Sequence, residues 1–327
     1  MTKALSQALS MLFFACALLI SDKTSAGDSD IRFSYYANGR IYVDKVSEIT
    51  GKHPIVVPPE KEWQDFKPSW SMTGDMLVFF RRVKNDPRVV NWKTILYIVN
   101  ADGTGLQKLT DGNHTNFNPT WTRDGKNSPL WNRKHPQGHF MVIRSMIGNK
   151  PEIFETLTDK SYHNWVHSSL ADGRLLVESN HPEMGYGYYL MTPKPKGKST
   201  YERIDDGGLL RMGLLIRISV SSDEKMITFG HLKGHKRKTV GYAISIADLD
   251  TKNLKVANAR VIANEKHEPF WYDYPRWTKD SKSVIYHANT TGKGRLFLYT
   301  LADGSTRQVS RNNEVDFRYP HVEGAPK

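Results

Sequence analysis

The stretch Pro119-Thr120-Trp121-Thr122, followed by Asp124-Gly125, decides the fold because the chain repeats it. An earlier copy reads Pro68-Ser69-Trp70-Ser71, and a later one reads Pro275-Arg276-Trp277-Thr278. Weaker copies begin at His167 and Ile218, where the tight turn is kept but the proline and tryptophan are replaced. A repeat of roughly 40 to 50 residues is typical of propellers and solenoids. The sequence therefore predicts a chain of similar β units.

Each repeat predicts four short strands. The phrase lies in an innermost strand, and an apolar run such as Met76 to Phe80 follows the turn. A third run, such as Ile95 to Val99, leads through Asp102-Gly103 to a polar outer strand. Runs of about five residues separated by Asp-Gly turns are hairpin signals. No long segment has helical periodicity, so we predict an all-β protein.

The two ends of the chain complement each other. Residues 31–57 supply second, third and fourth strands, whereas Phe317 to Val322 supplies only an innermost strand. Pairing that last strand with the first three closes a ring and leaves only short, protected edges. We predict a β-propeller of about six four-stranded blades in a single domain over residues 27–327. The units start at Pro68, Pro119, His167, Ile218, Pro275 and Pro320.

Residues 1–26 predict a secretory signal peptide. Lys3 gives a positive start, residues 8–20 are apolar, and Thr24-Ser25-Ala26 offers small residues for cleavage. The apolar run is too short for a comfortable membrane span. It also contains Cys16, the single cysteine, so disulfides cannot stabilise the mature protein. We expect an exported monomer, periplasmic or secreted, with no integral membrane span.

The formal net charge of +12 indicates an anionic partner. In an exported protein this favours an acidic polysaccharide or an envelope glycan over nucleic acid. A basic surface that only keeps the protein soluble is the alternative.

The phrase Pro-x-Trp-Ser/Thr-x-Asp-Gly, with outer strands such as Leu106 to Asp111, resembles the WD40-like repeat of TolB-like propellers. The resemblance covers nearly all of the chain after the leader. TolB carries an additional α/β domain before its propeller, which we do not expect here. The resemblance implies a second functional class, a non-catalytic periplasmic module whose channel mouth captures an envelope protein.

The loops between second and third strands are expected to open on one face. They begin at Arg81-Arg82, Asn132-Arg133-Lys134-His135, Asn180-His181-Pro182, His231-Leu232-Lys233 and His287-Ala288-Asn289. Four of the five bring histidine to that rim, which the repeat does not require. Two of them, at His181 and His231, belong to the blades whose phrase has lost its proline and tryptophan. We expect the function there, with a solvated basic rim as the alternative.

Loops that enter the innermost strands also vary between blades. Their distinctive residues are Trp165, Arg217, Tyr272, Arg318 and Tyr319. The Asp and Asn residues in the same loops have a structural explanation, because their side-chain oxygens accept hydrogen bonds from backbone N–H groups at turns.

Histidine, tyrosine and arginine are suited to β-elimination beside a uronic carboxylate, which needs a base, an acid and a neutralising cation. Propeller lyases acting on oligogalacturonate and on ulvan are similar at the level of the fold. By that analogy we predict Arg133 as carboxylate clamp, His135 or His181 as base, and Tyr188 as acid. The other predicted substrate-binding residues are Trp165, His231, Tyr272, Arg318 and Tyr319.

The sequence predicts no cofactor. His163 and His167 have the spacing of helical zinc ligands, but four residues on a strand span about 13 Å. His135 and His139 share a loop and are able to converge, although a metal needs further ligands. A divalent metal held by rim histidines of several blades is left open. No serine-hydrolase elbow, phosphate loop or His-Glu-x-x-His motif is present.

Overall fold

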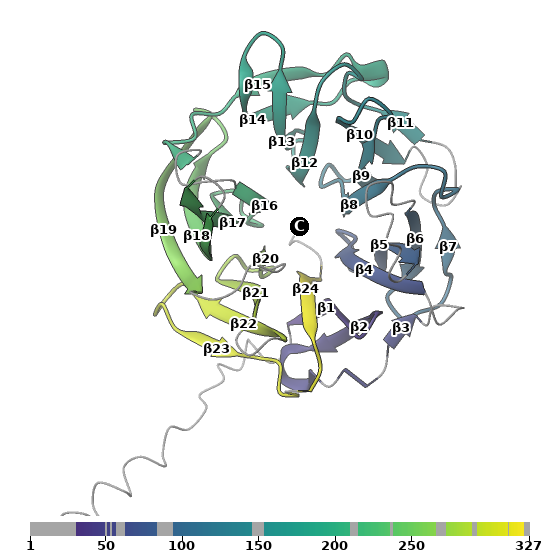
Figure 1. Cartoon of the computed structure of the whole chain (residues 1–327), viewed down its shortest axis with the longest axis vertical. Coiled ribbons are helices and arrows are strands. Elements are labelled where there is room, and N and C mark those ends of the chain that lie inside the picture. Colours follow the sequence, from purple (N-terminus) through teal and green to yellow (C-terminus); the bar gives the residue numbers. More distant parts are fainter. Residues whose placement is uncertain are drawn as a thin grey trace, which may run out of the picture.

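The computed structural model describes residues 31–49, 51–52, 54–56, 63–83, 94–145, 154–209, 215–235, 238–265, 273–289, 293–312 and 314–323. Within these ranges, six four-stranded antiparallel sheets surround a central axis as the blades of a propeller (Figure 1). The predicted all-β class and the number of blades are confirmed. No helix in the described part of the chain is long and apolar enough to cross a membrane.

We name the blades A to F, each from its innermost strand outward. Blade A contains β24 (Phe317–Val322), β1 (Arg32–Ala37), β2 (Arg40–Lys45) and β3 (Pro54–Val56), and blade B contains β4 (Trp63–Trp70), β5 (Met76–Val83), β6 (Ile95–Asn100) and β7 (Gln107–Lys108). Blade C contains β8 (Asn116–Trp121), β9 (Pro129–Lys134), β10 (Phe140–Ser145) and β11 (Phe154–Thr156), and blade D contains β12 (Asn164–Ser169), β13 (Leu175–His181), β14 (Gly185–Thr192) and β15 (Thr200–Arg203). Blade E contains β16 (Leu215–Val220), β17 (Met226–His235), β18 (Lys238–Asp250) and β19 (Lys255–Glu265), and blade F contains β20 (Asp273–Trp277), β21 (Ser283–Asn289), β22 (Gly294–Thr300) and β23 (Thr306–Gln308).

The last strand closes the ring as predicted. Strand β24 pairs antiparallel with β1, with Phe33 opposite Val322 and Ala37 opposite Phe317. Figure 1 shows the yellow C-terminal strand beside the purple N-terminal strands. Because both ends of the chain build one blade, opening that blade would open the whole ring.

The tryptophan of the phrase joins blade C to blade B and blade F to blade E through a hydrogen bond. Trp121 Nε1 donates to the carbonyl of Ser69 at 2.9 Å, and Trp277 Nε1 donates to the carbonyl of Ser219 at 3.1 Å. Both indoles are buried. The apolar cores lie between blades in the same way, as where Leu190 of blade D packs with Phe229 of blade E.

A bulge interrupts the pairing of each innermost strand at the phrase. In five blades the residue at the bulge has a positive φ, which is uncommon for residues other than glycine. These residues are Lys67 (φ 51°), Asn118 (φ 45°), Arg217 (φ 60°), Tyr274 (φ 30°) and Tyr319 (φ 51°). In blade D the register shifts between Val166 and Ser168 without such a residue. The bulge resets the alternation of side chains and so decides which residues reach the axis.

Candidate functional site

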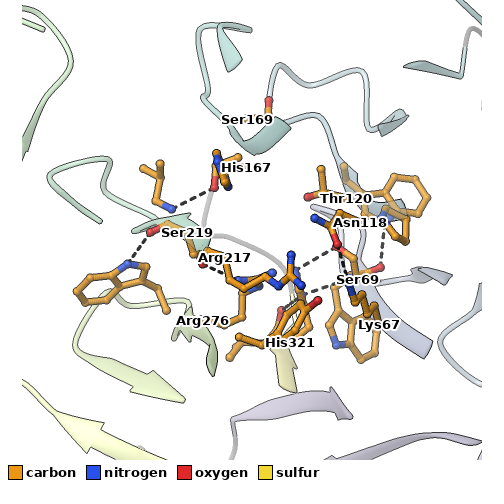
Figure 2. Close-up of a pocket in the computed structure, with 18 of the residues that line it drawn as sticks. Lys67, Ser69, Asn118, Thr120, His167, Ser169, Arg217, Ser219, Arg276 and His321 are labelled. Atoms are coloured by element: carbon orange, nitrogen blue, oxygen red, sulfur yellow. Dashed lines mark hydrogen bonds between the residues drawn. The ribbon is translucent and has the colours of Figure 1, made fainter. Parts of the chain in front are cut away.

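A cavity of about 130 Å³ lies on the axis, between the innermost strands of all six blades (Figure 2). A cavity of roughly 10–15 Å³ is enough to hold one water, so this cavity has room for several waters or for a small polar group. That space suits a small polar group and not a folded partner. We call this cavity the channel site.

The channel site is lined by basic side chains. They are Lys67, Arg123, His167, Arg217, Arg276 and His321. The described residues that line it include no aspartate or glutamate. Charges of one sign that line a cavity inside the protein add their potentials, so the site attracts anions.

Three of these cations converge on the ring of Tyr274. The ring centroid lies 5.0 Å from Lys67 Nζ, 4.6 Å from Arg217 Cζ and 5.7 Å from Arg276 Cζ. Like charges gathered around one ring repel one another, by roughly 1–4 kcal/mol per pair at an effective dielectric constant near 20. A single ring gives a cation only about 0.5–2 kcal/mol. An anion bound among the three would relieve this repulsion.

Two positions of the repeat place these charges on the axis. Lys67 and Arg217 occupy the bulge, and Arg276 occupies the variable position of the phrase, where blades B and C carry Ser69 and Thr120. Lys67 Nζ donates to Asn118 Oδ1 at 2.9 Å, which holds the ammonium inside the channel (Figure 2). The sequence interpretation singled out Arg217 but missed Lys67 and Arg276. Their signal was a cation where other blades carry small or neutral residues.

Arg123 and His321 have structural partners. Arg123 donates from Nη1 to Ser221 O at 3.1 Å and from Nη2 to Ser222 O at 2.7 Å, which links blade C to blade E. His321 lies 3.1 Å from Ser69 Oγ through Nε2 and accepts from the N–H of Trp70 at 3.3 Å through Nδ1. Burial lowers the pKa of His321 to about 3, so its imidazole is neutral near pH 7.

Blade D contributes a histidine with an acidic neighbour. His167 lines the channel site, and its Nε2 lies 3.4 Å from Glu178 Oε2. The hydroxyl of Tyr186 donates to Glu178 Oε1 at 2.8 Å. Burial opposes ionisation of Glu178, but His167 and Tyr186 outweigh it and hold the pKa of this carboxyl below its ordinary value.

The histidines of the β9–β10 turn converge, as their shared loop predicts. The rings of His135 and His139 stack with centroids 4.5 Å apart. Burial lowers the pKa of His139, and electrostatic repulsion from His135 lowers it further. Over the described ranges, no group of three or more histidine, cysteine, aspartate or glutamate side chains has the geometry to hold a metal ion.

Two predicted substrate contacts lie at neighbouring strands with different exposure. Arg133 is buried, donates from Nε to Asn116 Oδ1 at 3.1 Å and packs over the ring of Phe154 at 4.3 Å. Trp165 is half-buried and meets the ring of Phe140 edge-on at 4.7 Å. Of the two, Trp165 is the one with a partly open ring.

The predicted base His181 and the predicted acid Tyr188 lie in blade D, and the predicted substrate contact His231 lies in blade E. His181 accepts from the N–H of Glu183 at 3.3 Å and contacts the ring of Tyr201 at 5.2 Å. Tyr188 is 4% exposed in the core between the two blades, and burial raises the pKa of its hydroxyl. His231 is 1% exposed and lies 3.4 Å from Ser245 Oγ. The catalytic roles of His181 and Tyr188, and the substrate-binding role of His231, stay predictions.

The remaining predicted contacts differ in position. Arg318 forms a two-point ion pair with Asp316, at 3.0 Å through Nε and 2.6 Å through Nη2. Tyr319 lines the channel site, and its ring lies 4.6 Å from that of Tyr274. Tyr272 and the predicted signal peptide over residues 1–26 lie outside the described residues.

The fold has counterparts among solved structures, although no family model and no curated protein sequence matches the chain. TolB from Acinetobacter baumannii is similar with a TM-score of 0.64 and 13% identity over 91% of this chain and 68% of TolB. Kuenenia stuttgartiensis hydrazine synthase gives 0.63 and 11% over 91% of this chain and 47% of that one. An oligogalacturonate lyase from Vibrio parahaemolyticus gives 0.48 and 11%, over 82% and 74% of the two chains, which is too low to support an inference. The chain is therefore a six-bladed propeller with the fold of TolB.

Proposed function

We propose that this propeller binds an acidic glycan and holds one of its anionic groups in the channel site. The observation that carries the proposal is the convergence of Lys67, Arg217 and Arg276 on one ring in a cavity whose described lining has no carboxylate. A charge-assisted hydrogen bond contributes about 1.5–3 kcal/mol. Three cations around one anionic group are therefore sufficient for a selective site.

Half-buried aromatic rings next to lining residues of the channel site support a carbohydrate ligand. Phe117 and Trp165 belong to the same strands as the lining residues Asn118 and Val166. Rings of Phe117, Phe140 and Trp165 contact one another with centroids 4.7–6.3 Å apart. A sugar ring stacked on Trp165 would lie beside the channel while its acidic group enters. The predicted export and positive net charge agree with an envelope glycan as the ligand.

Calorimetric titration with polygalacturonate fragments tests the proposal, with the fully methyl-esterified fragments as the matched neutral ligand. We expect binding of the acid only, weakening as salt rises because screening reduces the attraction. Equal affinity for the ester would contradict the proposal and would favour the alternative class, a module that captures a protein. The same samples, followed by the absorbance of unsaturated products, test the predicted cleavage and the role of His181.

The repeat itself supplies suitable variants. Asn118 shows that asparagine is accepted at the bulge, and Ser69 shows that serine is accepted at the variable position. We therefore expect Arg217→Asn and Arg276→Ser each to weaken acid binding by about tenfold or more without loss of folding. Lys108→Gln on the outer strand β7 removes the same charge at an exposed position and is the control. A loss as large in Lys108→Gln would show that net charge, and not the channel site, determines affinity.

A further inference from the structure

His167 stands where the repeat places an apolar residue. The corresponding residues in the other blades are Pro68, Pro119, Ile218, Pro275 and Pro320. Blade D has exchanged that residue for an imidazole that lines the channel site (Figure 2). The exchange also coincides with the loss of the positive-φ bulge in this blade. Blade D therefore has a titratable side chain in the channel wall at a position where the other five blades have proline or isoleucine.

Glu178 is an equally unusual neighbour. It pairs with Trp165 across β12 and β13, and the corresponding residues are Phe80 in blade B and Asn132 in blade C. Its side chain is only 15% exposed, and its ion pairs in the described ranges are with His167 at 3.4 Å and His163 at 4.0 Å. A buried carboxylate is costly without a positive partner. The wall of blade D therefore contains a carboxylate whose partners carry charge only when they are protonated.

The protonation state of the imidazole sets the sign of the effect. A neutral imidazole carries one donor nitrogen, one acceptor nitrogen and no charge in either tautomer. Protonation makes both ring nitrogens donors and adds a positive charge to the channel wall. Glu178 stabilises that charge, because its Oε2 lies 3.4 Å from His167 Nε2.

We propose that His167, supported by Glu178, is a proton-dependent anion contact of the channel site, so that binding an anion takes up a proton. The inference rests on the proposed function and adds a specificity-determining residue to it. A ligand is held more tightly as the pH falls, whereas Lys67, Arg217 and Arg276 keep their charge throughout.

Other titratable groups near β12 do not explain such a dependence equally well. The charged or titratable groups on the strands packed with β12 are Arg133, Lys134, Arg144, Glu178, His181 and Arg217. His163 directly precedes β12, and the rings of Tyr186 and Tyr188 on β14 lie beyond Glu178. Arginine and lysine keep their charge below pH 8. His163 shares Glu178 but does not line the channel site, and His321 lines it with a pKa of about 3.

Sulfate is the probe for this inference, because it remains a dianion between pH 5.5 and 8, whereas phosphate changes charge. We expect the parent protein to bind sulfate about tenfold or more tightly at pH 5.5 than at pH 8, as one charge-assisted hydrogen bond allows. In His167→Gln the affinity is the same at both pH values. His163→Gln, which removes the neighbouring histidine on the same carboxylate, keeps the parent's dependence.

Equal affinity of the parent at the two pH values, or an unchanged dependence in His167→Gln, would overturn the inference. Thermal unfolding checks that each variant is folded. Should His167→Gln not fold, Glu178→Gln decides, because loss of the carboxylate must shrink the gain at pH 5.5. Absence of sulfate and of acidic-glycan binding at both pH values contradicts the proposed function itself, whereas pH-independent binding contradicts only the role of His167.

Discussion

Blades B and D share four strands and the same connection, but they use the start of the innermost strand differently. Blade B has Pro68 and the buried Trp70, while blade D has His167 and Ser169 at the same places. Each blade also pairs charges between its first two strands. In blade B, Arg81 and Asp65 are fully paired at 2.6 and 3.0 Å and almost completely buried.

In blade D the corresponding region has the His167–Glu178 pair, whose charge depends on a proton. The comparison teaches that residues kept by the repeat build the ring, whereas residues that depart from it give the channel its chemistry. Three stability predictions follow the comparison from its largest effect to its smallest.

The largest effect is expected where a regular blade is joined to its neighbour. Trp121→Ala removes a buried indole and its hydrogen bond to Ser69, so we expect the free energy of unfolding to fall by about 3–5 kcal/mol. Urea denaturation followed by fluorescence measures the change. A loss below about 1 kcal/mol would show that the phrase is not what holds the blades together.

The next effect concerns His321, through which the closing strand contacts blade B. Its folded pKa of about 3 lies below the ordinary value near 6.5, so the unfolded chain takes up the proton first. The contribution to stability is complete above about pH 6.5 and declines by about 1.4 kcal/mol per unit as the pH falls toward 3. We expect about 2 kcal/mol to be lost by pH 5.

Comparing unfolding at pH 7 and pH 5 in His321→Gln tests this, since the variant should lose most of that slope. His114→Gln, at an exposed histidine, should keep the slope of the parent. An identical slope in all three proteins would mean that His321 is not held neutral in the folded state.

The smallest effect is expected in blade D, at the position that matches Trp121. The Oγ of Ser169 accepts from the N–H of Arg123 at 3.0 Å. Ser169→Ala should cost only about 1 kcal/mol, since it removes one hydrogen bond and little apolar surface. A loss of stability as large as that of Trp121→Ala would show that this position contributes equally to stability in regular and altered blades.

The fold was predictable because prolines, Asp-Gly turns and tryptophans recur at the same structural positions in successive blades. The complementary ends predicted the pairing of β24 with β1, which the structure confirms. Convergence of His135 and His139 also followed from their shared turn.

The channel site was harder to predict because of the bulge. A residue with positive φ shifts the alternation of side chains, so a two-residue period cannot tell that Lys67 and Arg217 reach the axis. Arg133 shows the opposite case. Its loop position predicted a side chain at the rim, but the side chain is enclosed by Asn116 and Phe154. Side-chain direction depended on packing between blades, which loop position alone does not predict.

The central claim is that Lys67, Arg217 and Arg276 hold an anion on the propeller axis. Crystals of the protein soaked in selenate, whose selenium scatters anomalously, test it most directly. We expect an anomalous peak in the channel site within hydrogen-bonding distance of these three side chains, and its loss in Arg217→Asn crystals. Peaks confined to the outer surface, with none in the channel site, would contradict it.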